Sequence, residues 1–131
     1  GTIIAVIPAA LRAVLKYVTK YTDNTGNSSA ASAVTATTDY FFFLSEYEVF
    51  GTISQGNTNE SSKQAQYSYY SAGNSKIKYN HSATSTAAIW WLRSPHASNS
   101  NFFVVVSAGG TVSYYSGEAV ISFGFAPGFC V

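Results

Sequence analysis

The sequence predicts an α+β fold in which one main N-terminal helix and a short second helix precede a small antiparallel sheet. Three observations support this fold class. Apolar residues recur every three or four positions in residues 9–20, as in an amphipathic helix. Residues 89–125 are rich in β-branched and aromatic residues and contain a Gly-Gly turn, as in paired strands. Long polar segments at residues 23–38 and 52–62 indicate irregular loops between these elements.

The length and composition limit the classes of protein to consider. At 131 residues the chain fits a single domain, residues 1–131. Charged residues make up only 10% of it, and the net charge of +1 with no Lys/Arg cluster argues against a nucleic-acid partner. No apolar run reaches the roughly 18 residues of a membrane span, so we expect no membrane insertion. The single cysteine, Cys130, excludes an internal disulfide and a Cys-based zinc site.

The first part of the chain is predicted to form a strand, a helix and a loop. Thr2–Ile7 has the β-branched content of a short strand. Pro8 then precedes the helix of residues 9–20, which has an apolar face and a solvated basic face. The apolar positions are Leu11, Val14, Leu15 and Val18, and the basic ones are Arg12, Lys16 and Lys20. Asp23–Thr38, rich in Asn, Ser, Thr and small residues, is predicted to be a loop.

A second strand and a short helix are expected next. Asp39–Leu44 is a continuous apolar run, short enough to be a strand buried on both faces. Ser45 and Glu48 have the spacing of a capping box. This spacing predicts a helix over Glu46–Phe50, which Gly51 ends.

Two polar connections follow, and they contain little regular structure. Residues 52–62 are predicted to be a loop, because Gln, Gly, Asn, Thr and Ser dominate them. The alternating polar and aromatic residues 63–70 fit either a helix or a strand edge. Within residues 71–88, only Lys76–Tyr79 has the character of a short edge strand.

The last third of the chain is predicted to form the antiparallel sheet. Ile89–Leu92 and Phe102–Ser107 are strands by composition. Ala108–Gly110 is a hairpin turn that leads into the returning strand Thr111–Tyr115. Val120–Phe125 is expected to be a further strand.

The residue types needed for catalysis do not form a recognisable set. His81 and His96 are the only histidines, and each stands in a polar loop without a spaced partner. Glu46 and Glu48 are two apart on a predicted helix, so their carboxylates do not face each other. No phosphate-binding loop, serine elbow or zinc spacing is present. We therefore predict a non-enzymatic protein with no catalytic residues, no cofactor and no metal site.

Two aromatic segments frame the C-terminal third. On a strand, Trp90 and Trp91 point to opposite faces, so one belongs to the core and the other to the far face of the sheet. Arg93 either holds loop carbonyls beneath the sheet or offers a cation to a ligand. Its position directly after three apolar residues favours the structural role.

The segment between these frames has the composition of a contact surface. Alternation on the strand after residue 101 gives two largely apolar faces. One face carries Phe102, Val104 and Val106, and the other carries Phe103, Val105 and Ser107. The sequence Ser113-Tyr114-Tyr115-Ser116 resembles an antibody contact patch. It equally fits an ordinary strand with surface tyrosines.

The residue usage of this segment is skewed. Residues 1–95 contain five Lys, three Gln, two Trp and three Glu, whereas residues 96–131 contain only Glu118 from these types. Together with Met, these are the residues that no codon ending in C encodes. A tract of AAC codons with randomised adenines would show the same absence.

The frame residues resemble a known family. The sequence Trp90-Trp91-Leu92-Arg93-Ser94-Pro95 and the ending Gly124-Phe125-Ala126-Pro127-Gly128-Phe129-Cys130 are similar to the variable proteins of diversity-generating retroelements. Ser98-Asn99-Ser100-Asn101 and Gly110 fit the same pattern, as do Ile7–Arg12, Val18–Thr22 and Leu44–Gly51 upstream. The resemblance covers most of the chain. It implies a C-type lectin fold of the formylglycine-generating-enzyme type, in which residues 1–89 are mostly scaffold and residues 90–131 form a variable ligand-binding region.

The resemblance also assigns roles to single positions. It implies a structural frame of Trp90, Trp91, Arg93, Pro95, Gly110 and Pro127, with Val104, Val106, Val112 and Ala119 as scaffold. It implies that the displayed, ligand-binding residues are Phe102, Val105, Ser107, Thr111, Ser113, Tyr114, Tyr115, Val120, Ile121 and Phe123, with Ser98, Asn99 and Asn101 beside them. Relatives usually carry more N-terminal scaffold, which suggests a trimmed N-terminus.

Two departures narrow the expected activity. The closing motif holds only Cys130, whereas formylglycine formation uses paired cysteines. The Glu-Pro-Asn, Gln-Pro-Asp and Trp-Asn-Asp motifs of calcium-dependent sugar binding are missing. The leading hypothesis is a receptor- or ligand-binding protein on a virion or prokaryotic cell surface, whose target and oligomeric state stay open. The alternatives are a structural or assembly module of such a surface, or a carbohydrate-binding lectin.

Overall fold

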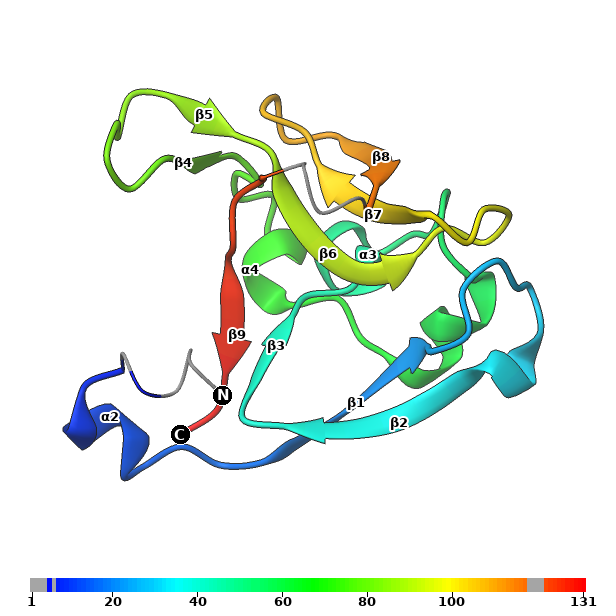
Figure 1. Cartoon of the computed structure of the whole chain (residues 1–131), viewed down its shortest axis with the longest axis horizontal. Helices are drawn as coiled ribbons and strands as arrows, with labels where there is room; N and C mark the ends of the chain where they lie inside the picture. The colour runs from blue at the N-terminus through cyan, green and yellow to red at the C-terminus, as the bar shows by residue number, and fades with distance from the viewer. Residues whose placement is uncertain (1–4, 6, 118–121) are drawn as a thin grey trace.

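The chain folds as several small antiparallel sheets with a few short helices, as an α+β protein does (Figure 1). The structure is a computed structural model, and it describes residues 5, 7–117 and 122–131. The helices are α2 (Ala9–Arg12), α3 (Glu46–Phe50) and α4 (Ser68–Ser71), with the 3-10 turns η1 (Ala31–Ala33) and η2 (Thr58–Lys63). The strands are β1 (Val18–Asp23), β2 (Val34–Asp39), β3 (Phe41–Phe43), β4 (Lys78–Tyr79), β5 (Ala87–Ala88), β6 (Trp90–Pro95), β7 (Phe102–Val106), β8 (Val112–Ser116) and β9 (Pro127–Phe129).

Four sheets result from the strand pairing. β1 pairs with β2, β4 with β5, and β6, β7 and β8 form a three-stranded sheet in that order. β9 pairs with β3, so the C-terminal frame returns to the middle of the chain (Figure 1). Gly128 is required in this pair, because a Cβ there would lie 2.5 Å from the Phe42 ring. The α+β class predicted from the sequence is confirmed.

The N-terminal region differs from the sequence prediction. The helix expected over residues 9–20 is wrong in extent: α2 has four residues, none of them buried, and residues 18–20 belong to β1. β1 pairs with β2 at all six positions from Val18↔Asp39 to Asp23↔Val34. This pairing outweighs a helical periodicity whose apolar side chains do not enter the core: Val14 is 52% exposed, and Leu11, Leu15 and Val18 are only half-buried. Asp23 and residues 34–38 of the expected loop Asp23–Thr38 are therefore strand, not loop.

Two expected strands lie partly or wholly outside the described residues. In Thr2–Ile7, residues 2–4 and 6 are not described. In Val120–Phe125, Val120 and Ile121 are not described, and Ala119 is likewise outside. The described part of this second segment does not form a regular strand; Gly124 makes a single parallel bridge with Trp90 instead.

The capping box before α3 is confirmed. The Glu48 amide donates to Ser45 Oγ at 3.1 Å, and the Ser45 amide donates to Glu48 Oε2 at 3.0 Å. Gly51 ends the helix in the left-handed conformation, with φ 71°. The strand before the helix is shorter than predicted, and it is not buried on both faces. In β3 only Phe42 is buried, whereas Phe41 and Phe43 are half-buried beside a cavity.

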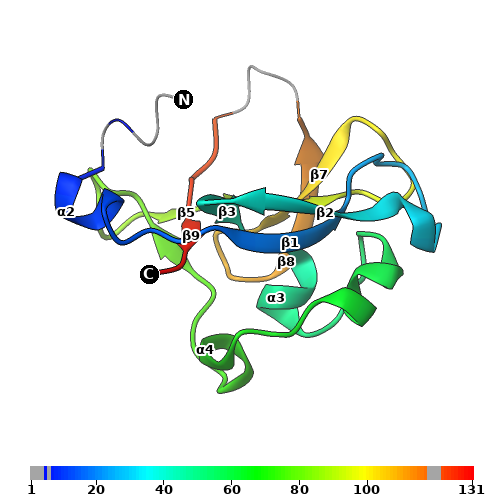
Figure 2. The same cartoon turned by 90° about the horizontal axis from the view of Figure 1, so that it is seen from below.

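The hydrophobic core lies between the three-stranded sheet and the helices α3 and α4. Trp90, Leu92, Val104 and Val106 face this core, together with Val49 from α3 and Tyr70 from α4. Both helices lie below β1 and β2 in Figure 2. The hairpin predicted at Ala108–Gly110 joins β7 to β8, with Gly110 at φ 84°. We call the sheet face toward the core the inner face and the opposite one the outer face.

The polar connections carry more regular structure than their composition predicts. Residues 52–62 include most of η2, and residues 63–70 lead into α4. The edge strand expected within Lys76–Tyr79 is β4. No helix of the ranges 5, 7–117 and 122–131 has the length and apolar character to cross a membrane.

Candidate binding site

Arg93 links β6 to the neighbouring sheets through a set of hydrogen bonds. Its Nε donates to Thr22 Oγ1 at 2.7 Å, and its Nη2 donates to the Tyr21 carbonyl at 3.3 Å. Nη1 donates to the Phe43 carbonyl at 2.8 Å and to the Glu48 carboxylate at 2.5 Å. The side chain is only 11% exposed. These contacts belong to a structural role, because they leave little of the guanidinium available to a ligand.

Glu48 is the shared partner of two cations. Its carboxylate accepts from Lys20 Nζ at 2.9 Å as well as from Arg93. Burial acts to raise the pKa of Glu48, but the hydrogen bond and charge of Arg93, with hydrogen bonds from Lys20 and the Ser45 amide, outweigh it and hold the pKa below its ordinary value. Lys20 also donates to the Tyr67 hydroxyl at 2.7 Å, so it is not on the solvated face that the sequence predicts.

Two buried glutamates fix η2 and the loop before it: Glu60 bonds η2 to β1 and β6, and Glu46 bonds the loop to α3. Glu60 accepts from the Asp23 amide at 2.9 Å and from Ser94 Oγ at 2.7 Å. Burial raises the pKa of Glu60, and these hydrogen bonds only partly offset that effect. Glu46 accepts backbone N–H bonds from Ser54, Gln55 and Gly56. The polar connection is therefore fixed by carboxylates that the sequence shows only as scattered acids.

The outer face of the three-stranded sheet carries an aromatic surface. Phe103 and Tyr115 are opposite each other on β7 and β8, and they are 40% and 43% exposed. The Phe123 ring packs on Tyr115 and on Trp91, with centroid distances of 4.9 Å and 5.1 Å. We call these four side chains the outer aromatic surface. Trp91 lies on the face opposite the core, as the alternation of the two tryptophans predicts.

Val105 is expected to be displayed, and this expectation is wrong. Its side chain is completely buried, although it points to the outer face. The reason is its place in the centre of the sheet: Trp91 on β6 and Ser113 on β8 flank it. Val105 is on the central strand of the three, and the much larger Trp91 side chain lies directly beside it on β6. Ser113 itself is half-buried.

Two other expected contact residues lie on the inner face. Phe102 and Tyr114 share that face with Val104, at the edge of the core. Their rings stack with a centroid distance of 5.4 Å, and His96 packs edge-on against Tyr114 at 4.8 Å. Tyr114 remains 44% exposed. The residues that the resemblance groups as one display are therefore divided between opposite faces of the sheet.

The small polar residues of the expected display include two pairs that stabilise local turns. Ser107 Oγ and Thr111 Oγ1 are 2.7 Å apart, and the Ser107 amide donates to the Thr111 carbonyl at 2.8 Å, which closes the β7–β8 hairpin. Asn99 Oδ1 accepts from the Asn101 amide at 2.9 Å. Ser98 and Asn101 are exposed beside these turns.

The expected frame residues hold the sheet in place. Trp90 is buried in the core, and its Nε1 donates to the Lys76 carbonyl at 3.0 Å. Pro95 is buried opposite Phe103. Pro127 pairs with β3 and is itself exposed.

Two hollows flank the outer aromatic surface. One, of about 230 Å³, is lined by Ser100, Asn101, Phe103 and Gly117. A Cβ on Gly117 would come within 3.0 Å of the Phe103 ring, so a glycine permits this close approach. The other, of about 370 Å³, is lined by Asn80, Ala88, Ile89, Ser122, Phe123 and Gly124. The exposed aromatic rings thus stand between two depressions.

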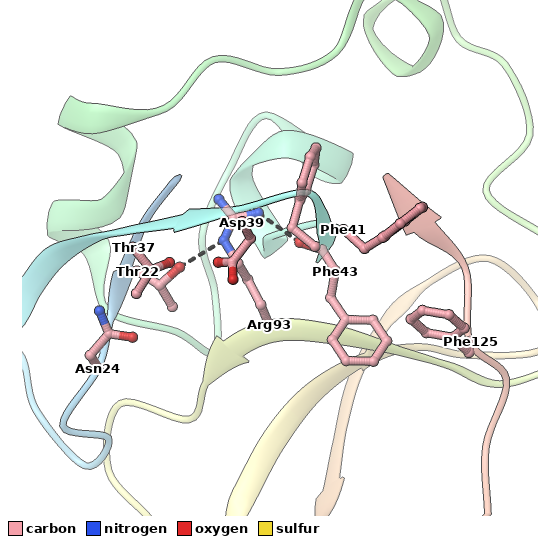
Figure 3. A pocket seen from close by; sticks show the side chains of 9 residues that line it. Thr22, Asn24, Thr37, Asp39, Phe41, Phe43, Arg93 and Phe125 are labelled. Atoms are coloured by element: carbon pink, nitrogen blue, oxygen red, sulfur yellow. Dashed lines mark hydrogen bonds between the residues drawn. The ribbon is translucent and has the colours of Figure 1, made fainter. Parts of the chain in front are cut away.

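A larger cavity, of about 610 Å³, lies beside Arg93 and Asp39 (Figure 3). We call it the cavity beside Asp39. It is lined by Thr22, Asn24, Thr37, Asp39, Phe41, Phe42, Phe43, Arg93 and Phe125. Figure 3 shows the polar side chains on one side of the cavity and Phe41, Phe43 and Phe125 on the other. Phe43 and Phe125 meet edge to face, with centroids 4.9 Å apart.

Within the described ranges, no three His, Cys, Asp or Glu side chains come together as a metal site would require. His81 lines a hollow of about 340 Å³ with Lys78 and Trp90. His96 packs against aromatic rings. Neither histidine is hydrogen-bonded to an acid in the part of the chain that the structure describes.

Sequence reasoning missed three parts of the candidate site. Phe103 was not among the expected contact residues, although its pairing with Tyr115 places both rings on the outer face. The strand register was the missing information, and alternation alone does not supply it. His96 was treated as an isolated loop residue. The cavity beside Asp39 brings together strands that are far apart in the sequence, so no local pattern points to it.

The fold and its surfaces define a small α+β domain with several antiparallel sheets. The chain matches, over residues 3–131, the model of a family described as a domain of unknown function (DUF6273), and it belongs to that family. No curated protein and no solved structure matches it. The family description states no activity.

Proposed function

We propose that the domain is a non-enzymatic binding module that contacts its target through the outer aromatic surface. The observation that carries this proposal is the exposure of Phe103 and Tyr115 side by side on a rigid sheet, with Phe123 and Trp91 packed beside them. Large aromatic side chains lose little conformational entropy on binding and dominate the energetics of many interfaces. The two flanking hollows give the surface relief into which a partner's side chains can fit.

We further propose that the displayed residues of the C-terminal region, which include Tyr115 and Phe123 of this surface, are diversified by a retroelement, in a protein with a C-type lectin fold. The support is the resemblance of the two frame segments and the skewed residue usage after residue 95. A target on a cell or virion surface, and a location of this protein on a virion or prokaryotic cell, follow from the same resemblance. The genome tests the claim directly: a reverse-transcriptase gene and a near-identical repeat rich in AAC should lie near the coding sequence. If both are missing, diversification is wrong and the binding proposal stands by itself.

The binding proposal is tested with the labelled domain on a panel of bacterial and archaeal cells, measured by flow cytometry. The double variant Phe103→Ser/Tyr115→Ser removes the two most exposed rings of the surface. We expect at least a tenfold loss of retention on any cell type that binds the native domain, because central aromatic contacts contribute about 2 kcal/mol or more each. Tyr79→Ser is the matched control, since Tyr79 is 56% exposed on β4 and outside the surface.

Unchanged retention of the double variant would show that the outer face is not the contact surface. Light scattering of the same proteins tests the assembly alternative, which the exposure of Phe103 also favours. A stable multimer that the double variant disrupts, with no retention on cells, would replace the binding proposal by self-association.

A further inference from the structure

The cavity beside Asp39 is separate from the outer aromatic surface, and its chemistry points to a different ligand. Of its lining residues, Arg93 comes from β6 and Phe125 from the segment before β9. The others come from the β1–β2 hairpin and β3. Its volume of about 610 Å³ lies in the usual range of small-molecule sites.

The hydrogen-bond donors of the cavity are nearly all in use. Arg93 donates through Nε and Nη2 once each and through Nη1 twice, which occupies four of its five N–H groups. The Asn24 amide nitrogen donates to the Thr35 carbonyl at 3.2 Å and to its hydroxyl at 2.8 Å. A ligand that needs donors, such as a carboxylate or phosphate, therefore finds few here.

Acceptors remain available on the same wall. The Asp39 carboxylate has no ion pair among the described residues, since both described pairs join Glu48 to Lys20 and to Arg93. The Asn24 side-chain carbonyl also has no hydrogen-bond donor in the described part of the chain. The hydroxyl of Thr37 lies on the same side (Figure 3). This wall is suited to a group that carries several N–H donors and a positive charge.

The opposite wall is suited to an apolar body. Phe41, Phe43 and Phe125 present ring faces and edges to the cavity. Aromatic rings also attract ammonium groups, and the chain already contains such a contact: Lys20 Nζ lies 4.1 Å from the centroid of the Phe42 ring. Acceptors on one wall and rings on the other match a cation on an apolar stem.

We propose that this cavity binds an organic ammonium group carried on an apolar body, with Asp39 as the counter-ion and Phe41, Phe43 and Phe125 as the apolar wall. Such a group comes either from a free amine or from a lysine side chain of a peptide. The site does not depend on the outer aromatic surface, so either assignment can fail without the other.

The test is a titration of the ¹⁵N-labelled domain followed by amide chemical shifts. 2-Phenylethylammonium is the probe, and 2-phenylethanol and 3-phenylpropionate are the neutral and anionic controls of similar shape. We expect shifts at Asn24, Thr37 and Asp39, and a dissociation constant about tenfold lower for the amine than for the alcohol, since a charged hydrogen bond is exchanged for a neutral one. Nα-acetyl-lysine methylamide forms a second arm that distinguishes a lysine side chain from a free arylalkylamine.

Asp39→Asn removes the counter-ion and should weaken amine binding about tenfold while leaving alcohol binding unchanged. Ser61→Lys is the matched control, because it makes the same change in net charge on η2, outside the cavity lining. Phe125→Ala should weaken the amine and the alcohol alike. Equal binding of amine and alcohol, or Asp39→Asn without effect, would overturn the proposal. Tighter binding of 3-phenylpropionate would overturn it in favour of an anion site at Arg93.

Discussion

Replacing Glu48 by Gln isolates the charge of the buried ionic cluster. The Glu48 side chain is 5% exposed, and it faces Lys20 and Arg93 at 2.9 Å and 2.5 Å. Gln is also accepted at the third position of a capping box, so the substitution retains the helix cap with Ser45. What it removes is the one negative charge between two cations whose own side chains are only 12% and 11% exposed.

The expected cost is about 3 kcal/mol of unfolding free energy at pH 7, near the lower end of the range for removing one partner of a buried ion pair. The lower end applies because Arg93 retains its bonds to Thr22 and to the carbonyls of Phe43 and Tyr21. Urea unfolding followed by tryptophan fluorescence measures this loss. Ser45→Ala is the control for the cap; it also removes the hydrogen bond from the Ser45 hydroxyl to Gln64, and its expected cost is about 1 to 2 kcal/mol.

The difference in unfolding free energy between the native protein and Glu48→Gln should depend on pH. The pKa of Glu48 is lowered in the folded protein, so its stabilising contribution is fully present above the pKa of an unfolded glutamate. This contribution decreases as the pH falls through the lowered pKa of Glu48 in the folded protein. The cost of Glu48→Gln should therefore shrink in acid. A cost below about 1 kcal/mol at pH 7, or one that does not shrink at low pH, would refute the assignment of this cluster as a stabilising ion network.

Three further predictions concern the buried Glu60, the buried Val105 and the positions that are expected to vary. Burial raises the pKa of Glu60 in the folded protein, so its contribution to stability is full below the pKa of an unfolded glutamate and is lost as the pH rises through the folded pKa. Glu60→Gln should therefore lower the unfolding free energy, measured in urea, by less at pH 7 than at pH 4. A loss that grows with pH would contradict this. Val105→Ala should destabilise the domain by about 2 kcal/mol, because two buried methyl groups are lost, whereas Tyr115→Ala should cost only about 1 kcal/mol in the same assay, because its ring is 43% exposed and loses mainly its packing on Phe123. If the proposed retroelement produces variants of this protein, sequencing of them should find variation at Ser98, Asn101, Tyr114 and Tyr115 but a small apolar residue at position 105. A polar residue at position 105 in folded variants would show that burial does not restrict this position.

Several features of the fold could be predicted from local sequence alone. The capping box depends on Glu48 following Ser45 by three residues, and both of its hydrogen bonds form. The β7–β8 hairpin depends on Gly110, whose positive φ disfavours other residues. The opposite orientations of Trp90 and Trp91 follow from strand alternation. In each case the cause lies within a few residues of the effect.

Other features were decided by contacts between distant segments. The periodicity of residues 9–20 favours a helix, but residues 18–20 belong to β1, which pairs with β2. Val105 and Phe103 alternate identically with their neighbours. Val105 is buried between Trp91 and Ser113, whereas Phe103 is exposed beside Tyr115. Register and strand order determine this difference, and neither is visible in one strand alone.

Local sequence patterns are therefore enough to predict the α+β class, the capped helix, the C-terminal hairpin and the aromatic character of the segment after residue 89. Contacts between distant segments set which aromatic side chains share a surface, and they bring Arg93, Glu48 and Lys20 together between β1, β6 and α3. They also create the cavity beside Asp39, where the β1–β2 hairpin, β3 and Phe125 converge. The physical reason is that hydrogen bonds and turns act over a few residues, whereas burial and ion pairing depend on what the rest of the chain brings alongside.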